Sequence, residues 1–511
     1  MNTRFAPVLF VATLLLCSSL FATEPNTSTR RWWSHIEAIA SDAMQGRDTG
    51  SEGYRKAAGY VVQQFVRNGL KAAGESGYYQ PVPLRRVRLR TDQSDIELVQ
   101  KDGVQKLQWF QQVTVPANAM LPEAIDAGLV FVGSSSYAQD LDIKGKILVQ
   151  LSPPRLMEGA PMPVVTAPPA GTVGLLGIDS TGGPEPRQWP VQYSVAMTLA
   201  GQAPAQNANP GLSMAFNPAF ADLLFEGSGH SYRELLSLSS QGKPLPNFAL
   251  PNTLRARMRV ESEDLTSDNL IAVLPGTDPI LANEHVVVSA HLDGYGVGEP
   301  RNGDSIYNGA FDDAAYVATL IGLAERLHDS HKKLKRSVLF VVVTGEEKGL
   351  LGSRYFTQHP SIPSGRMVAD INLDALRPIF PLKMLTVVGL DESTLGDTVK
   401  RVAEPMSIRI QRDLEPLRNL MRRGDLLNFM QVGVPAVGFV FGYDKGSAEE
   451  RVYRRWYAER YHAPGDDLKQ PWDPPAAAKF NEFFYRLVET LADDNARPRW
   501  NAGNAFGQPT Q

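Results

Sequence analysis

Short, continuous runs of apolar residues recur through the second half of the chain. Each run is bounded by polar residues or by a helical pattern, which is typical of strands that are buried on both faces of a central sheet. The runs are Asn269–Pro275, Val286–Ala290, Ser337–Val343, Met367–Leu373, Lys383–Leu390 and Pro435–Phe441. Between them, apolar residues repeat with the helical period, most clearly over Asp312–Leu327. The pattern predicts an α/β fold with a mostly parallel, mixed central sheet flanked by helices.

The first half of the chain has a different texture. A helical period predicts an amphipathic helix between a loop at Gly46–Gly53 and an end near Gly69, with an apolar face made of Ala57, Ala58, Val61, Val62, Phe65 and Val66. Residues 118–255 are rich in Pro, Gly and Ala and contain short strand candidates such as Gly128–Gly133 and Lys146–Leu151. This part of the chain indicates a small β-rich insert.

These textures suggest how the chain is divided. We expect one discontinuous domain over residues 24–117 and 256–496, the β-rich inserted domain over residues 118–255, and a polar, Gly-rich flexible tail over residues 497–511.

Residues 1–22 have the pattern of a secretory signal peptide. Arg4 supplies the positive charge, Phe5–Leu16 the apolar run, and small residues stand before a cleavage point near Ala22. The run is shorter than the ~20 residues that cross a bilayer, and no later stretch is both long and uncharged enough, so we expect no membrane association of the mature form. The signal predicts a periplasmic or secreted protein.

Cysteine usage limits the chemistry of any metal site. Cys17 is the only cysteine, and it falls within the signal. A lipoprotein would use it as the lipidated residue, but the bulky Leu16 stands where such sites need a small one. The mature chain then has no thiolate, so a bound metal must be held by His, Asp or Glu.

Charge and composition exclude some classes of protein. The chain has 511 residues with 51 Lys+Arg against 55 Asp+Glu, a formal net charge of −4, so it is not a strongly basic nucleic-acid binder, and we expect no nucleic acid partner. Hydrophobic residues make up 43% and charged residues 21%, which is typical of a globular protein. The basic stretch Leu84–Arg90 alternates like a strand and is interpreted as a solvated sheet face.

Candidate metal ligands follow the apolar runs. In open α/β sheets, ligands bind beyond the carboxyl ends of the strands, so the residues directly after each run carry the most information. Those residues, with a pair of acids at a predicted helix start and a more distant histidine, are His291, Asp293, Asp312, Asp313, Glu346, Glu347, Asp374 and His462. Each one alone has an ordinary explanation as a helix cap, a solvated acid or a turn residue. Together, however, so many carboxylates at one sheet edge would repel one another unless cations neutralised them, which predicts a metal cluster.

The ordered motifs resemble a known family. They are ASDAMQGRDTGSEG, HLDG, GAFDDAA, TGEEKGLLGSRYF, INLDA, GDLLNFMQVGVPAV and YHAPGDD. The set resembles the two-zinc exopeptidases that include secreted bacterial leucyl aminopeptidases and glutamate carboxypeptidases, with the glutaminyl cyclases as an offshoot. The resemblance implies a zinc-peptidase (phosphorylase/hydrolase-like) architecture. Residues 118–255 look like the protease-associated insert that many members carry.

The resemblance also implies roles for the candidate residues. It places two Zn²⁺ ions in the chain, with His291 and Asp374 on one, Glu347 and His462 on the other, and Asp312 bridging the two. Asp293 would orient the His291 ring, and Glu346 would be the general base. Consecutive glutamates cannot point the same way, so one can ligate while its neighbour faces a bound water. Zinc suits imidazole nitrogen and carboxylate oxygen without a thiolate.

Three further expectations concern the surroundings of the site. In relatives the peptide bond after the bridging aspartate is often cis, so we expect a cis bond between Asp312 and Asp313. Tyr316 stands where members usually carry a small residue, which predicts a bulkier pocket wall. Arg377 lies near the site in sequence and could meet a substrate carboxylate, although an internal ion pair is the favoured interpretation.

The predicted function is therefore a secreted zinc-dependent exopeptidase that hydrolyses peptides, with an aminopeptidase favoured over a carboxypeptidase by analogy of fold. Two alternatives stay open. One is a glutaminyl cyclase-like acyltransferase with one zinc, and the other is a non-catalytic binding module on the same fold. Side-chain specificity and oligomeric state are not determined by the sequence.

Overall fold

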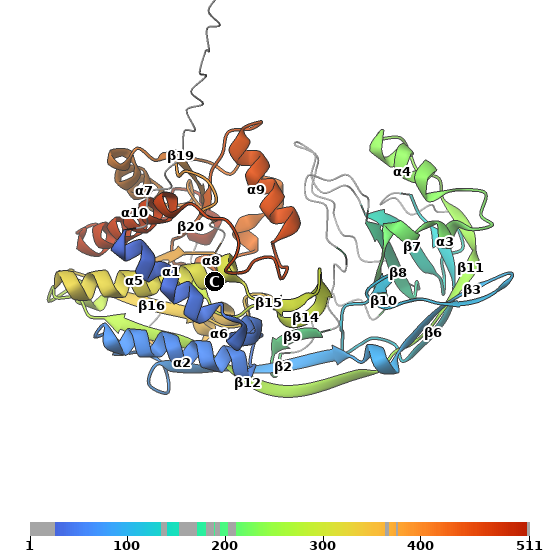
Figure 1. The fold of residues 1–511 in the computed structure, drawn as a ribbon, viewed down its shortest axis with the longest axis horizontal. Helices are drawn as coiled ribbons and strands as arrows, with labels where there is room; N and C mark the ends of the chain where they lie inside the picture. The colour runs from blue at the N-terminus through green and yellow to red at the C-terminus, as the bar shows by residue number, and fades with distance from the viewer. Residues whose placement is uncertain are drawn as a thin grey trace, which may run out of the picture.

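The protein consists of two lobes, each with its own sheet and its own core (Figure 1). They are seen in a computed structural model that describes residues 26–133, 141–152, 171–179, 189, 195–202, 211–362, 367–374 and 377–507. The long strands β2 (Tyr79–Leu89) and β12 (Val260–Leu274) run antiparallel to each other and extend from the larger lobe toward the smaller one.

The larger lobe is built on a mixed sheet of ten strands within the described residues. Their order is β19-β18-β20-β17-β13-β16-β12-β2-β9, with β1 paired to β12. β13 pairs in parallel with both β16 and β17, whereas β12 is antiparallel to β16. Besides β2 and β12, the strands are β1 (Lys71–Ala72), β9 (Val195–Leu199), β13 (His285–His291), β16 (Ser337–Val343), β17 (Met367–Asn372), β18 (Met384–Val388), β19 (Arg409–Gln411) and β20 (Ala436–Phe441).

Helices cover both faces of this sheet, as the apolar runs require. One face packs with α1 (Thr27–Ile39), α2 (Glu52–Arg67), α5 (Ala315–Ser330), α7 (Leu395–Ala403), α9 (Ala448–Glu459) and α10 (Pro474–Asp493). The other face packs with α6 (Leu351–Gln358) and α8 (Leu426–Gln431). β13 and β16 are almost wholly buried, because apolar side chains on both faces of each strand meet helices. The predicted α/β fold with a mixed, helix-flanked sheet is confirmed.

The predicted amphipathic helix near the N-terminus is α2. Ser51 caps it by accepting a hydrogen bond from the backbone N–H of Tyr54, and the helix buries Ala57, Val61 and Phe65 against the core. The six apolar runs all contain strands of the sheet, with β16 spanning Ser337–Val343 as the pattern predicts.

The smaller lobe is a second sheet with a separate apolar core. Among the described residues its strand order is β4-β3-β11-β6-β7-β8-β10-β5. The strands are β3 (Asp95–Gln100), β4 (Gly103–Lys106), β5 (Val113–Thr114), β6 (Ala124–Phe131), β7 (Ile147–Ser152), β8 (Gly174–Asp179), β10 (Leu212–Phe216) and β11 (Phe248–Arg257), with the helices α3 (Asp222–Phe225) and α4 (Tyr232–Ser240).

The extent of this lobe differs from the predicted insert at residues 118–255. The sheet already begins at Asp95, where Ile96 and Leu98 point into the core of the smaller lobe and β3 pairs with β11. The stretch before residue 118 lacks the Pro- and Gly-rich texture, so composition alone does not reveal that it belongs to this sheet. In the opposite direction, β9 lies within the expected insert but pairs with β2 of the larger sheet.

The two ends of the chain were also subjects of prediction. The signal peptide at residues 1–22 lies outside the described residues. At the other end, the expected flexible tail makes contacts: the Trp500 indole donates to the carbonyl of Gly433 at 3.0 Å, and Asn501 donates to the carbonyl of Asp391 at 2.7 Å. An aromatic ring that finds an apolar neighbour and an acceptor is held in place despite its polar, Gly-rich surroundings. No helix in the described ranges is long and apolar enough to cross a membrane.

The basic stretch at Leu84–Arg90 is part of β2, and its arginines are paired across the strands. They contact acids of β12 in the pairs Arg85–Asp264 at 2.8 Å, Arg86–Glu263 at 2.9 Å and Arg90–Glu261 at 3.0 Å. The ladder of ion pairs is a solvated sheet face, in agreement with the interpretation from the sequence.

Arg47 ties the N-terminal segment to the loops that carry the candidate site. It is fully buried, and its guanidinium donates to the backbone carbonyls of Leu292 (2.8 Å), Ile39 (3.2 Å), Asn308 (2.5 Å) and Gly309 (3.0 Å). We predict that Arg47→Met lowers the free energy of unfolding by about 3–5 kcal/mol, because buried carbonyl acceptors lose their donor. Urea denaturation measures the effect. Arg85→Met, which removes an exposed arginine, is the control and should leave the midpoint unchanged; equal midpoints for both variants would contradict the prediction.

Candidate metal centre

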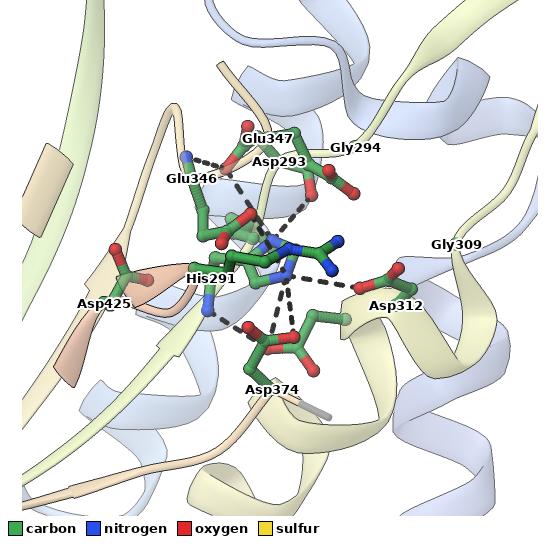
Figure 2. A network of polar contacts seen from close by, with 12 residues as sticks. His291, Asp293, Gly294, Gly309, Asp312, Glu346, Glu347, Asp374 and Asp425 are labelled. Carbon is green, nitrogen blue, oxygen red and sulfur yellow. Dashed lines mark hydrogen bonds and ion pairs between the residues drawn. The ribbon is translucent and has the colours of Figure 1, made fainter. Parts of the chain in front are cut away.

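The candidate residues meet at one edge of the large sheet (Figure 2). β13, β16 and β17 are adjacent and parallel, so their carboxyl ends lie side by side. His291 is the last residue of β13, Glu346 and Glu347 follow β16, and Asp374 follows β17. The topology therefore brings together side chains from three separated parts of the chain.

Asp312 lies between two imidazoles. It belongs to the turn Ala310–Ala314 that leads into α5, and the peptide bond between Asp312 and Asp313 is cis, as expected. Asp312 Oδ1 lies 3.4 Å from His291 Nε2, whereas Asp312 Oδ2 lies 3.3 Å from His462 Nε2. The two oxygens of one carboxylate thus face different histidines.

His462 reaches the centre from the loop after α9. Its Nε2 lies 3.4 Å from Glu347 Oε2, and its Nδ1 lies 2.8 Å from the hydroxyl of Tyr295. The ring of Tyr461 stacks on the imidazole with centroids 3.6 Å apart. These contacts from both sides fix the orientation of the ring.

The remaining candidates lie on the His291 side. His291 Nε2 is 3.9 Å from Asp374 Oδ1 and 4.0 Å from Glu346 Oε2. Glu346 and Glu347 are consecutive, and their side chains reach different histidines. This is the division of roles that consecutive glutamates permit.

Asp293 is fully buried and contacts His291 mainly through its backbone. Its carbonyl oxygen lies 3.1 Å from His291 Nδ1, whereas its carboxylate Oδ1 lies 3.8 Å away. The carboxylate accepts hydrogen bonds from the backbone N–H of Glu346 at 3.1 Å and from the hydroxyl of Thr49 at 2.9 Å. Asp293 therefore holds both the imidazole and the start of the Glu346–Glu347 loop.

Asp466 supports the centre although no role was predicted for it. Its carboxylate accepts hydrogen bonds from the backbone N–H groups of Phe311 (2.9 Å) and Asp312 (3.0 Å), so it fixes the turn that presents the Asp312 side chain. Burial raises the pKa of Asp466 to about 6, with nearby Asp312 adding to the shift. The residue lies four positions after His462 in the YHAPGDD motif, which is the only sequence signal that marked it.

Arg377 forms the internal contact that the sequence analysis favoured. Its Nη2 lies 3.5 Å from Asp312 Oδ2, and its Nη1 donates to the carbonyl of Asp374 at 2.6 Å. The guanidinium also lies over the Trp456 ring at 4.7 Å.

Several carboxyls of the centre are held in surroundings that oppose their charge. Burial raises the pKa of Glu346 well above its ordinary value and raises that of Glu347 to about 7. Burial, opposed by the charge of His291, also raises the pKa of Asp374. Each shift is in the direction of an acid that lacks a neutralising cation.

The donor set fits metal ions with nitrogen and oxygen ligands. Zinc binds both at about 2.0–2.2 Å, so two ligands of one tetrahedral ion lie about 3.3–3.5 Å apart. The distances from Asp312 to the two histidines, and from His462 to Glu347, fall in or next to that range. His291 Nε2, Asp312 Oδ2 and Glu347 Oε1 are buried and have no hydrogen-bond partner among the described residues. One ligand atom each of His291, Asp312 and Glu347 lie within 4.8 Å of one another, which is close enough to share an ion.

A pocket opens directly beside the centre. It is lined by Asp312, Glu346, Asp374 and His462 on one side and by residues of the 418–426 segment, β20 and the end of α9 on the other. Tyr316 does not line this pocket. It is buried in the core of the larger lobe, because this position of α5 faces the core, so the expected effect on the pocket wall is wrong.

Comparisons of sequence connect the chain with known proteins. Residues 269–488 match the sequence model described as Peptidase family M28, which confirms the resemblance seen in the motifs. The chain is 24% identical to the "probable leucine aminopeptidase 2" of Aspergillus oryzae over 308 residues. That match covers 54% of this chain and 58% of the relative, so the chain spans little more than half the length of this curated relative.

Comparisons of structure extend over both lobes. The aminopeptidase from Aneurinibacillus sp. strain AM-1 superposes with a TM-score of 0.60 at 17% identity, covering 92% of this chain and 95% of that one. The zinc aminopeptidase from Bacillus subtilis superposes with a TM-score of 0.55 at 15% identity, covering 92% and 96%. At these identities the comparison shows a shared fold.

Proposed function

Residues 269–488 form a domain of peptidase family M28, and on this premise we propose that the chain is a zinc-dependent exopeptidase that acts as an aminopeptidase on peptides. The names of its relatives support the choice of an aminopeptidase. The geometry of the centre supports a hydrolase, because it joins metal-binding groups with an acid that has no ligand role.

The arrangement around Asp312 carries this proposal. Its two oxygens face His291 and His462 separately, which is the geometry of a carboxylate that bridges two ions. We assign His291 and Asp374 to one zinc and Glu347 and His462 to the other. Two zinc ions of this kind, about 3.5–4 Å apart, would supply a water of lowered pKa and polarise the scissile carbonyl.

Glu346 carries out the proton transfers in this scheme. Its carboxylate accepts a proton from the attacking water as the new C–O bond forms. It then donates that proton to the nitrogen of the leaving amine as the C–N bond breaks, and the carboxylate is restored. Asp293 keeps Glu346 in position through the hydrogen bond to its backbone N–H.

The remaining parts of the proposal concern domain organisation and location. We propose that residues 1–22 are removed as a signal peptide and that the protein works in the periplasm or outside the cell. Residues 118–255 are proposed to form most of a protease-associated-like lobe. Its placement at the ends of the long strands β2 and β12 leaves the metal centre within the larger lobe.

A panel of dipeptides tests the proposed activity. We predict that the zinc-loaded protein cleaves dipeptides with a free N-terminal amine, with or without a C-terminal block, and does not cleave N-blocked ones. Mass spectrometry of the products and metal analysis of the same samples are the measurements. Cleavage of N-blocked but not C-blocked peptides would indicate a carboxypeptidase, and formation of pyroglutamyl peptide from an N-terminal glutamine would indicate a cyclase. Bound zinc without any turnover would indicate a binding module.

A further inference from the structure

The pocket beside the metal centre carries an unusual set of charges. Its acidic lining residues, Asp312, Glu346 and Asp374, all belong to the centre itself. Outside the centre, every charged residue that lines it in the described part of the chain is an arginine, namely Arg377, Arg418 or Arg423. When bound cations neutralise the acids, the electrostatic potential of the pocket is positive.

Arg423 is the arginine best placed to meet a substrate. It is exposed, and its Nη2 lies 3.4 Å from the hydroxyl of Tyr461, whose ring stacks on His462. The next residue, Gly424, packs so close to the centre that a Cβ there would lie 3.6 Å from Asp374 Oδ2. Arg423 is thus anchored beside the centre and faces the pocket from the segment before α8.

Arg418 and Arg377 differ from Arg423 in how they are held. The side chain of Arg418 is only 8% exposed and is held by the hydroxyl of Tyr453 at 2.7 Å and by Glu415 at 3.4 Å. Glu415 also pairs with Arg454 at 2.8 Å, so one carboxylate is shared by two arginines. Arg377 contacts Asp312 and Asp374 and supports the centre.

The rest of the pocket suits the stem of an acidic side chain. Val388, Leu420, Leu426 and Phe439 provide apolar lining, which packs well against methylene groups. A carboxylate at the end of such a stem would meet guanidinium groups, whose planar fork matches its geometry. An apolar side chain would satisfy the lining but leave the arginines without this contact.

We propose that this pocket receives the side chain of the substrate's N-terminal residue and that it selects glutamate or aspartate through Arg423, with Arg418 contributing to the positive wall. This inference rests on the proposed aminopeptidase function. It assigns the substrate class as peptides with an acidic N-terminal residue.

The matched pair of glutamate and glutamine substrates isolates the charge. In aminoacyl-coumarin amides, Glu and Gln differ in charge but hardly in size, and neither carries a free C-terminal carboxylate. We expect kcat/KM of the zinc-loaded protein to be about 10- to 100-fold higher for Glu than for Gln, as for a charge-assisted hydrogen bond. Arg423→Met should abolish this difference while leaving the rate for Gln unchanged, and Arg423→Glu should shift the preference toward Lys.

The neighbouring Arg422 provides the control. It is exposed like Arg423 but does not line the pocket, so Arg422→Met should keep the Glu preference. A wild-type protein that prefers Leu, or a Glu preference that survives Arg423→Met, would overturn the inference.

Two further outcomes separate this inference from others. If Arg423→Met weakens only dipeptides with a free C-terminal carboxylate and spares their C-terminal amides, the arginine binds the peptide terminus and the inference is wrong. If free-amine substrates are cleaved but Glu is no faster than Gln, the pocket assignment fails and the proposed function stands. If no substrate is cleaved with zinc bound, the proposed function fails and the inference fails with it.

Discussion

Glu346→Gln is expected to lower kcat by a factor of about 10²–10⁴, the usual contribution of a general base, while zinc content stays at the wild-type level. Glutamine keeps the size of the side chain and its contacts but cannot accept the proton of the attacking water. Steady-state kinetics on a free-amine substrate and metal analysis of the same preparation measure the two quantities.

The adjacent Glu347 makes a matched comparison for this variant. Both glutamates are buried on the same loop, but Glu347 lies 3.4 Å from His462, whereas Glu346 lies 4.0 Å from His291. Glu347→Gln should therefore lose zinc as well as activity, because an amide oxygen is a weaker ligand than a carboxylate. If Glu346→Gln turns over at the wild-type rate with zinc bound, or if it is the variant that loses zinc, the two roles are assigned wrongly.

Asp312→Ala is expected to have the second large effect, because one carboxylate serves both proposed ions. Zinc content should fall at both sites, and activity should drop to that of protein treated with a chelator. Stability should fall too, since zinc at 100 times its dissociation constant stabilises each site by about 2.7 kcal/mol. Metal analysis, kinetics and thermal unfolding with and without added zinc are the measurements.

The Asp312 variant has a built-in control. Asp374→Ala removes a proposed ligand of one ion only, so it should keep zinc at the Glu347–His462 side. Wild-type protein stripped by a chelator should need two equivalents of zinc to recover full activity. Recovery with one equivalent, or equal zinc content in Asp312→Ala and wild type, would show that Asp312 does not bridge two ions.

Much of the candidate centre could be predicted because strand ends are marked in the sequence. His291, Glu346, Glu347 and Asp374 follow apolar runs that the structure confirms as parallel or neighbouring strands. Parallel strands place their carboxyl ends at one edge, so residues after them must meet. The position of His462 could not be reached in this way, because it follows a helix, and only the resemblance of YHAPGDD brought it into the set.

Other features depend on directions that a linear pattern does not contain. Asp466 was not singled out, because its role is to accept hydrogen bonds from a turn about 150 residues away. Tyr316 was expected at a pocket wall but faces the core, because one helical position decides between the two. Arg423 gained meaning only when the segment before α8 was seen against Asp374.

The sequence by itself determined the α/β class, the strands, the helix after the acidic turn and the identities of the metal-binding groups, because periodicity and residue type are local properties. The tertiary structure alone decided that Asp312 offers one oxygen to each histidine, that the smaller sheet starts at Asp95, and that arginines line the pocket outside the metal centre. Those facts depend on distances between atoms far apart along the chain, and these distances are set by how strands and helices pack rather than by the order of the residues.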